Sequence, residues 1–123
     1  MATRSYISKL LPDGSVRGIY CHFDGYPDGV GAILKEHYTD SDKVDELLEL
    51  GSISSLGPEI GEAHDYGNPT KGFVVAYHRD RGEDLEPNTV YSTVRDMLRE
   101  APGELGAEFA YVFEAGAWQV HKL

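Results

Sequence analysis

The stretch T-R-S-Y-I-S-K-L-L-P-D-G-S-V-R-G-I-Y-C-H-F, residues 3–23, contains two runs rich in β-branched and aromatic residues around a turn signal. Pro12 presets its own backbone φ angle, and Gly14 tolerates a positive one, which together are typical of a tight turn. The stretch therefore predicts a β-hairpin with strands over residues 3–10 and 16–23. A hairpin at the start of the chain favours an antiparallel sheet over a regular alternation of strands and helices.

The second strand of this hairpin is predicted to place its side chains alternately on two faces of the sheet. The face with the apolar set is expected to be the core. Its members are Ile19, Cys21 and Phe23, and the outward set is Tyr20, His22 and Asp24. Cys21 is therefore expected to be a buried, inert thiol and not a nucleophile.

The rest of the chain contains the periodic patterns of three helices and three further strands. Helices are predicted over residues 30–38, 40–50 and 92–101, strands over 73–78, 108–114 and 117–121, and an irregular connection with a short strand near 52–56 over residues 51–72. The order is ββαα, irregular, βαββ. This order predicts an α+β fold with a mostly antiparallel sheet of about five strands and about three helices, in a single domain over residues 1–123.

The bulk composition is that of an ordinary globular protein of 123 residues, with 41% apolar and 26% charged residues. No stretch approaches the roughly 20 apolar residues that cross a bilayer, and the first residues lack the apolar run of a signal peptide. The single cysteine fits a reducing compartment and provides no Cys/His set for structural zinc. We expect a cytoplasmic protein without membrane association or a cofactor.

Negative charge is concentrated in one segment. The net charge is −10, and residues 40–65 hold eight acids against Lys43 alone. Binding to nucleic acid draws its energy from Lys and Arg that displace counterions, so direct binding to DNA or RNA is not expected. The segment predicts instead an acidic interaction surface, with a solvated acidic face as the alternative. The surface consists of Asp40, Asp42, Asp45, Glu46, Glu49, Glu59 and Glu62.

Two predicted strands end in the same His-x-Asp pattern. His22 and Asp24 close one strand, and His78 and Asp80 close another. Residues two apart on a strand project from the same face, so neighbouring strand ends would bring two imidazoles and two carboxylates to one rim of the sheet. Such a rim suits a divalent cation or a histidine that acts as a general base. The alternative is that each Asp caps the following loop and each His fills a half-buried position.

The segment D-G-Y-P-D-G-V-G, residues 24–31, lies between a predicted strand and a predicted helix, where phosphate-binding loops are found. Asp24 and Asp28 oppose a phosphate, so a structural turn is the simpler interpretation. Arg79 and Arg81 would supply positive charge for a small anionic or nucleotide-like ligand, with a tyrosine stacked on a base. Alternatively, the two arginines pair with nearby acids and pin the loops. The candidate ligand-binding rim consists of Tyr20, His22, Asp24, Tyr26, Asp28, His78, Arg79, Asp80 and Arg81. His64-Asp65 lies in the irregular region without partner histidines at helical spacing, and we predict no metal site there.

Four sequence blocks carry a resemblance to a known family. They are I-Y-C-H-F-D-G-Y-P-D-G-V-G (19–31), D-K-V-D-E-L-L-E-L-G-S-I-S-S-L-G (42–57), V-A-Y-H-R-D-R-G-E (75–83) and Y-V-F-E-A-G-A-W-Q-V (111–120). In this order they resemble a family of small proteins encoded by bacteriophages, prophages and mobile elements, over nearly the whole chain. Phe23 stands where other members often have Trp, which keeps an aromatic residue there. The resemblance implies a protein that acts inside a bacterial cell, and it carries over no activity, cofactor or catalytic residue.

Two functions from different classes follow from these observations. The leading hypothesis is a non-catalytic accessory protein of a phage or mobile element, whose acidic segment binds a basic surface of a host protein. The alternative is a ligand or metal site at the rim of His22, Asp24, His78 and Asp80, used to sequester or hydrolyse a small molecule. No residue is assigned as catalytic, and no oligomeric state is predicted.

Overall fold

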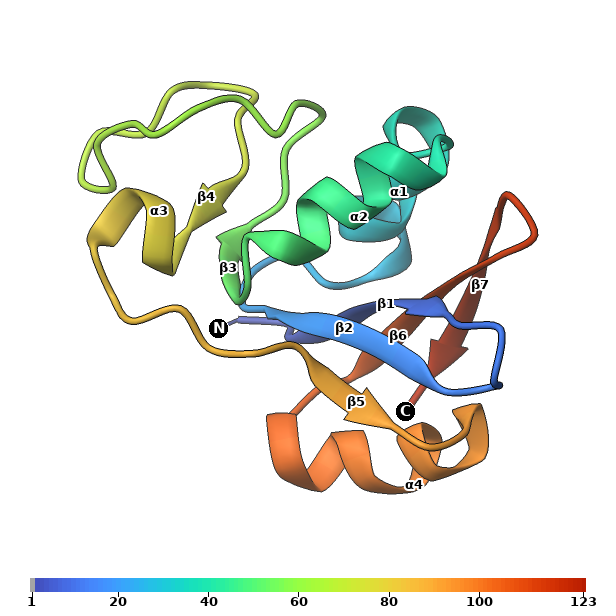
Figure 1. Cartoon of the computed structure of the whole chain (residues 1–123). Helices are drawn as coiled ribbons and strands as arrows, with labels where there is room; N and C mark the ends of the chain where they lie inside the picture. Colours follow the sequence, from blue (N-terminus) through green and yellow to red (C-terminus); the bar gives the residue numbers. More distant parts are fainter. Residues whose placement is uncertain (1) are drawn as a thin grey trace.

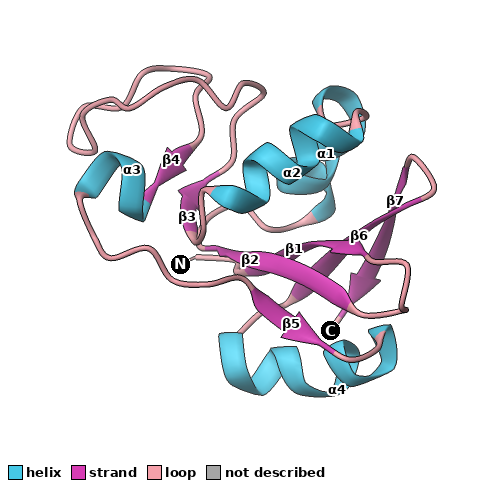
Figure 2. Cartoon of the chain, viewed as in Figure 1, coloured by secondary structure: helices cyan, strands magenta, loops and turns pink. Residues whose placement is uncertain are grey.

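The computed structural model describes residues 2–123, and its strands form one mixed sheet (Figures 1 and 2). The order across the sheet is β4-β3-β2-β1-β6-β7, and β5 pairs with β2 beyond the end of β3. The strands are β1 (Ser5–Leu10), β2 (Val16–Cys21), β3 (Ile53–Ser55), β4 (Val75–Ala76), β5 (Thr89–Tyr91), β6 (Phe109–Glu114) and β7 (Ala117–Lys122). The helices are α1 (Ala32–His37), entered through a single π-helical turn at Pro27–Gly31, α2 (Ser41–Glu49), α3 (Tyr77–Arg81) and α4 (Val94–Leu105).

The sheet is mostly antiparallel, as the sequence predicts. The hairpin of β1 and β2 forms with Ile7 opposite Ile19, and the C-terminal hairpin joins β6 to β7. Two parallel pairings, β1 with β6 and β2 with β3, connect these units. In the C-terminal turn, Ala115 has φ 52° and Gly116 has φ 79°, which is the left-handed pair that a tight hairpin requires. The predicted α+β fold is therefore confirmed.

Helices cover both faces of the sheet (Figure 1). On one face α1 and α2 pack on a core that includes Ile7, Ile19 and Tyr111. On the other face α4 packs Met97 and Ala101 against a second apolar cluster. Burial of these side chains on both faces is the main stabilising term, at about 25 cal/mol per Å² of apolar surface removed from water.

Side-chain caps begin the two longer helices. Asp40 accepts a hydrogen bond from the Asp42 amide (3.1 Å) at the start of α2, as its composition predicts. At α4 the cap is Thr93, one residue after the predicted start of the helix at residue 92, and its side chain accepts from the Asp96 amide at 3.0 Å. This helix also continues through Pro102 to Leu105, beyond the predicted end. The φ that the proline ring fixes is itself helical, although the ring removes one backbone hydrogen bond from the helix.

Two details of the predicted strands are wrong. β2 ends at Cys21, and Phe23 is 43% exposed instead of lying in the core. The strand predicted over residues 73–78 is reduced to β4, after which the chain turns into α3. Residues 56–72 form the predicted irregular connection, with one bridge between Glu59 and Phe73. Within residues 2–123, no helix combines the length and apolar character needed to cross a bilayer.

Candidate functional site

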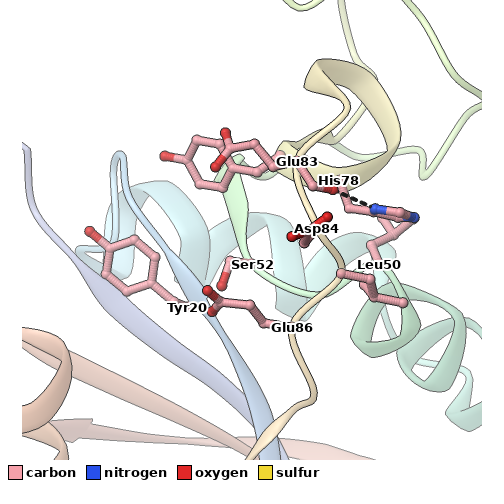
Figure 3. Close-up of a pocket in the computed structure, with 9 residues that line it drawn as sticks. Tyr20, Leu50, Ser52, His78, Glu83, Asp84 and Glu86 are labelled. Carbon is pink, nitrogen blue, oxygen red and sulfur yellow. Dashed lines mark hydrogen bonds between the residues drawn. The ribbon is translucent and has the colours of Figure 1, made fainter.

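The segment of residues 83–88, here called the strap, crosses the edge of the sheet between α3 and β5 (Figures 1 and 3). A hollow of about 230 Å³ lies between this strap and the ends of β2 and β3. It is lined by Tyr20, Leu50, Ser52, Tyr77, His78, Glu83, Asp84, Leu85 and Glu86. Two of these, Tyr20 and His78, belong to the rim predicted from sequence. The hollow is the candidate site.

The strap is fixed at both ends. The His78 ring donates from Nδ1 to the carbonyl oxygen of Glu83 at 2.6 Å, which is the dashed line in Figure 3. At the other end Asn88 donates from its amide to the carbonyl of Leu48 (2.8 Å) and accepts from Arg17 at 3.1 Å. The strap is therefore tied to α3 on one side and to the C-terminal end of α2 on the other. Its side chains between these ties are exposed to solvent.

The walls of the hollow combine aromatic and acidic groups. The Tyr20 hydroxyl lies 2.6 Å from Nδ1 of His22. Burial raises the pKa of Tyr20 and Tyr77, so both phenols are neutral at physiological pH. Glu86 points across the hollow towards Ser52 and Tyr20 in Figure 3. The site thus combines neutral phenol side chains with carboxylates.

The acidic residues of α2 lie next to the acidic residues of the strap. A shallow groove lined by Arg17, Glu49, Leu85 and Glu86 joins the end of α2 to the strap. On α2 the predicted surface residues Asp42, Glu46 and Glu49 are exposed, and so are Asp40, Glu59 and Glu62.

Asp45 departs from the expected acidic surface. Its carboxylate lies 2.9 Å from Lys9 Nζ and 3.5 Å from an Arg17 nitrogen. Those two side chains are cross-strand neighbours in the β1–β2 hairpin and project towards α2. The carboxylate is therefore compensated within the fold, whereas Asp42, Glu46 and Glu49 form no ion pair with any residue that the structure describes.

The predicted rim of two His-x-Asp strand ends does not form. His78 and Asp80 lie on α3, where residues two apart point in different directions. Asp24 is exposed and accepts from the Tyr26 hydroxyl at 3.2 Å. In the part of the chain that the structure describes, no group of three or more His, Cys, Asp or Glu residues is placed to hold a metal ion.

Asp80 is instead the centre of a buried ion cluster. Its carboxylate is fully buried and lies 2.9 Å from Arg79 Nε and 3.2 Å from His64 Nε2. It also accepts from the backbone amides of His64 (3.1 Å) and Ala76 (2.8 Å). Burial opposes ionisation, but these hydrogen bonds and the Arg79 charge hold the pKa of Asp80 below its usual value.

The same cluster holds the irregular connection in place. Arg79 donates to the carbonyl oxygens of Ile60 (2.8 Å) and Val74 (2.7 Å). The Thr70 amide donates to Nδ1 of His64 at 2.8 Å, which leaves the proton of a neutral ring on Nε2. The cluster thereby ties the two ends of residues 60–74 to α3.

The segment 24–31 is a structural turn. Asp24 adopts a left-handed conformation with φ 58°, and its carbonyl accepts from the Val30 amide at 2.8 Å. The Gly25 amide donates to Thr3 at 2.8 Å, and the Gly29 amide donates within the turn at 3.0 Å. These amides already donate hydrogen bonds within the protein, so they do not form a phosphate cradle. Asp28 is exposed at its tip.

The two arginines of the predicted rim pair with acids, as the simpler alternative holds. Arg79 pairs with Asp80, and Arg81 Nε lies 3.2 Å from Glu83.

Cys21 is fully buried, and this burial raises the pKa of its thiol to about 12. The prediction that Cys21 belongs to the core is confirmed.

Sequence reasoning missed the strap, Ser52, Tyr77 and the role of His64. The composition of R-G-E-D-L-E-P-N, residues 81–88, did contain a signal. A glycine and a proline bracket four residues with three carboxylates and one leucine, which is unusual for a simple loop.

Comparison with protein-family models, with characterised proteins and with solved structures finds no match to this chain.

Proposed function

We propose that this protein is a non-catalytic binding module that docks on a basic surface of a host protein, and that it serves a phage or mobile element inside a bacterial cell. The observation that carries the proposal is the meeting of two acidic segments on one face. Glu49 of α2 and Glu86 of the strap line one groove with Leu85, which is 51% exposed, and the other carboxylates of the two segments are exposed as well. The acidic face is defined as Glu46, Glu49, Glu83, Asp84, Leu85 and Glu86.

This face has the composition of a charged interface with an apolar centre. The groove that Glu49, Leu85 and Glu86 share shows that the two segments adjoin. The tie from Asn88 to Leu48 holds the strap against α2, so the face is preorganised. A preorganised surface loses less conformational entropy on binding.

The charge suits association with a basic partner. The chain has a net charge of −10, and opposite charges steer two proteins together at rates that fall with ionic strength. A basic surface that normally holds nucleic acid matches this field. The resemblance to proteins of phages and mobile elements supports the bacterial setting.

Several groups that could perform catalysis are committed to the fold, which supports a binding role. Cys21 is buried with a raised pKa. Both ring nitrogens of His64 and both oxygens of Asp80 take part in hydrogen bonds of the buried cluster. His78 uses Nδ1 to hold the strap.

The test is capture of partners from bacterial lysate at low and at high salt. The variant E46Q/E49Q/E86Q should lose the salt-sensitive partners that the wild type captures. The matched control E100Q/E108Q/E114Q removes the same charge from exposed positions away from the acidic face, and it should retain them. Equal capture by both triple variants, or no salt-sensitive partner for the wild type, would contradict the proposal.

A further inference from the structure

We infer that the hollow beneath the strap receives the guanidinium group of an arginine side chain from the basic partner. This inference rests on the proposed function and adds to it the residue that the partner must supply. It is carried by the hollow itself, whose walls combine two phenol rings with carboxylates.

The size of the hollow fits one long side chain. Its volume of about 230 Å³ lies below the roughly 300–1,000 Å³ of pockets that enclose drug-sized ligands. The strap side chains that line it are exposed to solvent, so a side chain presented by a folded partner can enter without a change in the sheet.

The charges around the hollow favour a cation. Glu83 is already paired with Arg81 at 3.2 Å. Among the residues that the structure describes, Asp84 and Glu86 have no such pairing with a cation. They are therefore the carboxylates available to an incoming positive group.

The aromatic walls favour arginine over lysine. A guanidinium is planar and weakly hydrated, so it stacks on a ring while its N–H groups reach carboxylates. Tyr20 and Tyr77 supply the rings, and Glu86 points across the same space towards Ser52 and Tyr20 (Figure 3). An ammonium has the charge but not the flat surface, so it gains less from this arrangement.

The anchoring of the strap preserves the shape of the hollow. Nδ1 of His78 donates to the Glu83 carbonyl, which fixes the strap at one end of the hollow. The tyrosines are held from the side of the sheet. The Tyr20 hydroxyl contacts Nδ1 of His22, and the backbone amide of Tyr77 donates a hydrogen bond to the Ser52 carbonyl at 3.3 Å. The walls are thus in place before a partner arrives.

The experiment uses hexaarginine and hexalysine as probes of the intact protein, followed by NMR titration of backbone amides. Hexaarginine should bind at least about 3-fold more tightly than hexalysine, with the largest shifts at residues 20, 52, 77 and 84–86. Tyr20→Leu and Glu86→Gln should each weaken hexaarginine about 3- to 10-fold and reduce its preference over hexalysine. The control Glu114→Gln removes one exposed carboxylate from the C-terminal hairpin and should change binding less than about 2-fold.

Each result separates this inference from the proposed function. Equal affinity for the two peptides, or shifts confined to α2, would overturn the arginine site and leave the acidic face as a general surface for cations. Unchanged binding by Glu86→Gln would also overturn it, and this exposed substitution does not threaten the fold. If neither peptide binds and the lysate yields no salt-sensitive partner, both the inference and the proposed function fail.

Discussion

Replacement of Asp80 by asparagine is expected to lower the free energy of unfolding by about 3–5 kcal/mol, the usual cost of breaking a buried ion pair from one side. The substitution keeps the size of the side chain and removes its charge. Arg79 then remains 15% exposed with no carboxylate to balance it. The irregular connection and α3 lose the group that holds them together.

The hydrogen bonds explain the size of the effect. One carboxylate oxygen accepts from His64 N and Arg79 Nε, and the other accepts from Ala76 N. An asparagine must turn its NH₂ group towards one of these sets of donors, whichever way the amide is oriented. Each buried donor left without an acceptor costs about 1–3 kcal/mol, to which the loss of charge adds. A domain of this kind has about 5–15 kcal/mol in total, so the loss is a large fraction.

Urea unfolding followed by the fluorescence of Trp118 measures the loss. This is the only tryptophan, and its indole is buried with Nε1 donating to the Tyr38 carbonyl at 2.9 Å. The control is Arg99→Gln, which breaks the exposed pair between Arg99 and Asp96. That pair should contribute less than about 1 kcal/mol.

The contribution of the buried cluster is tested by comparing the two variants. If Asp80→Asn and Arg99→Gln unfold at the same urea concentration with the same slope, the buried cluster is not a major source of stability. Amide hydrogen exchange adds a local readout, since the Thr70 and Ala76 amides donate to members of the cluster. Their protection should fall in Asp80→Asn before protection in the central strands falls.

Three further predictions concern pH, reactivity and backbone conformation. Because the folded pKa of Asp80 lies below its ordinary 3.8, its contribution to stability is complete above about pH 5 and is lost as the pH falls through 3.8 and then through the folded value. Acid titration of stability should therefore show a component that Asp80→Asn lacks. Cys21, with its pKa near 12, should react with a disulfide reagent only after urea unfolds the chain, and rapid reaction of the native protein would contradict its burial. Gly61→Ala should destabilise by more than Gly82→Ala in urea titrations, because both glycines have positive φ but only at Gly61 would a Cβ atom clash with the Phe73 ring.

Local chemistry was sufficient to predict much of the fold. The first hairpin follows from the turn residues and the composition of its strands, and α2 follows from the cap Asp40 and its apolar spacing. β5 was missed because it has three residues and pairs only with the start of β2, a contact between distant segments that no local pattern reports. The same holds for Asp45, whose carboxylate is balanced by Lys9 from the first strand.

The error at residues 73–81 bears most directly on the site. An apolar run of four residues followed by a polar stretch has no clear period. The sequence pattern therefore does not distinguish a strand that continues from a strand that is followed directly by a helix. On a strand His78 and Asp80 would share a face; on α3 they are separated by roughly 200° around the helix axis. Asp80 therefore enters the buried cluster that fixes α3, while His78 reaches outward and holds the strap at Glu83. His78 and Asp80, which suggested a metal rim, thus have separate roles on opposite sides of one short helix: Asp80 fixes α3, and His78 holds the strap over the hollow.

His78→Ala removes the tie between the strap and α3, so it should weaken hexaarginine binding with little loss of stability. Asp80→Asn should reduce both hexaarginine binding and the free energy of unfolding, because it also loosens α3, the helix that carries Tyr77.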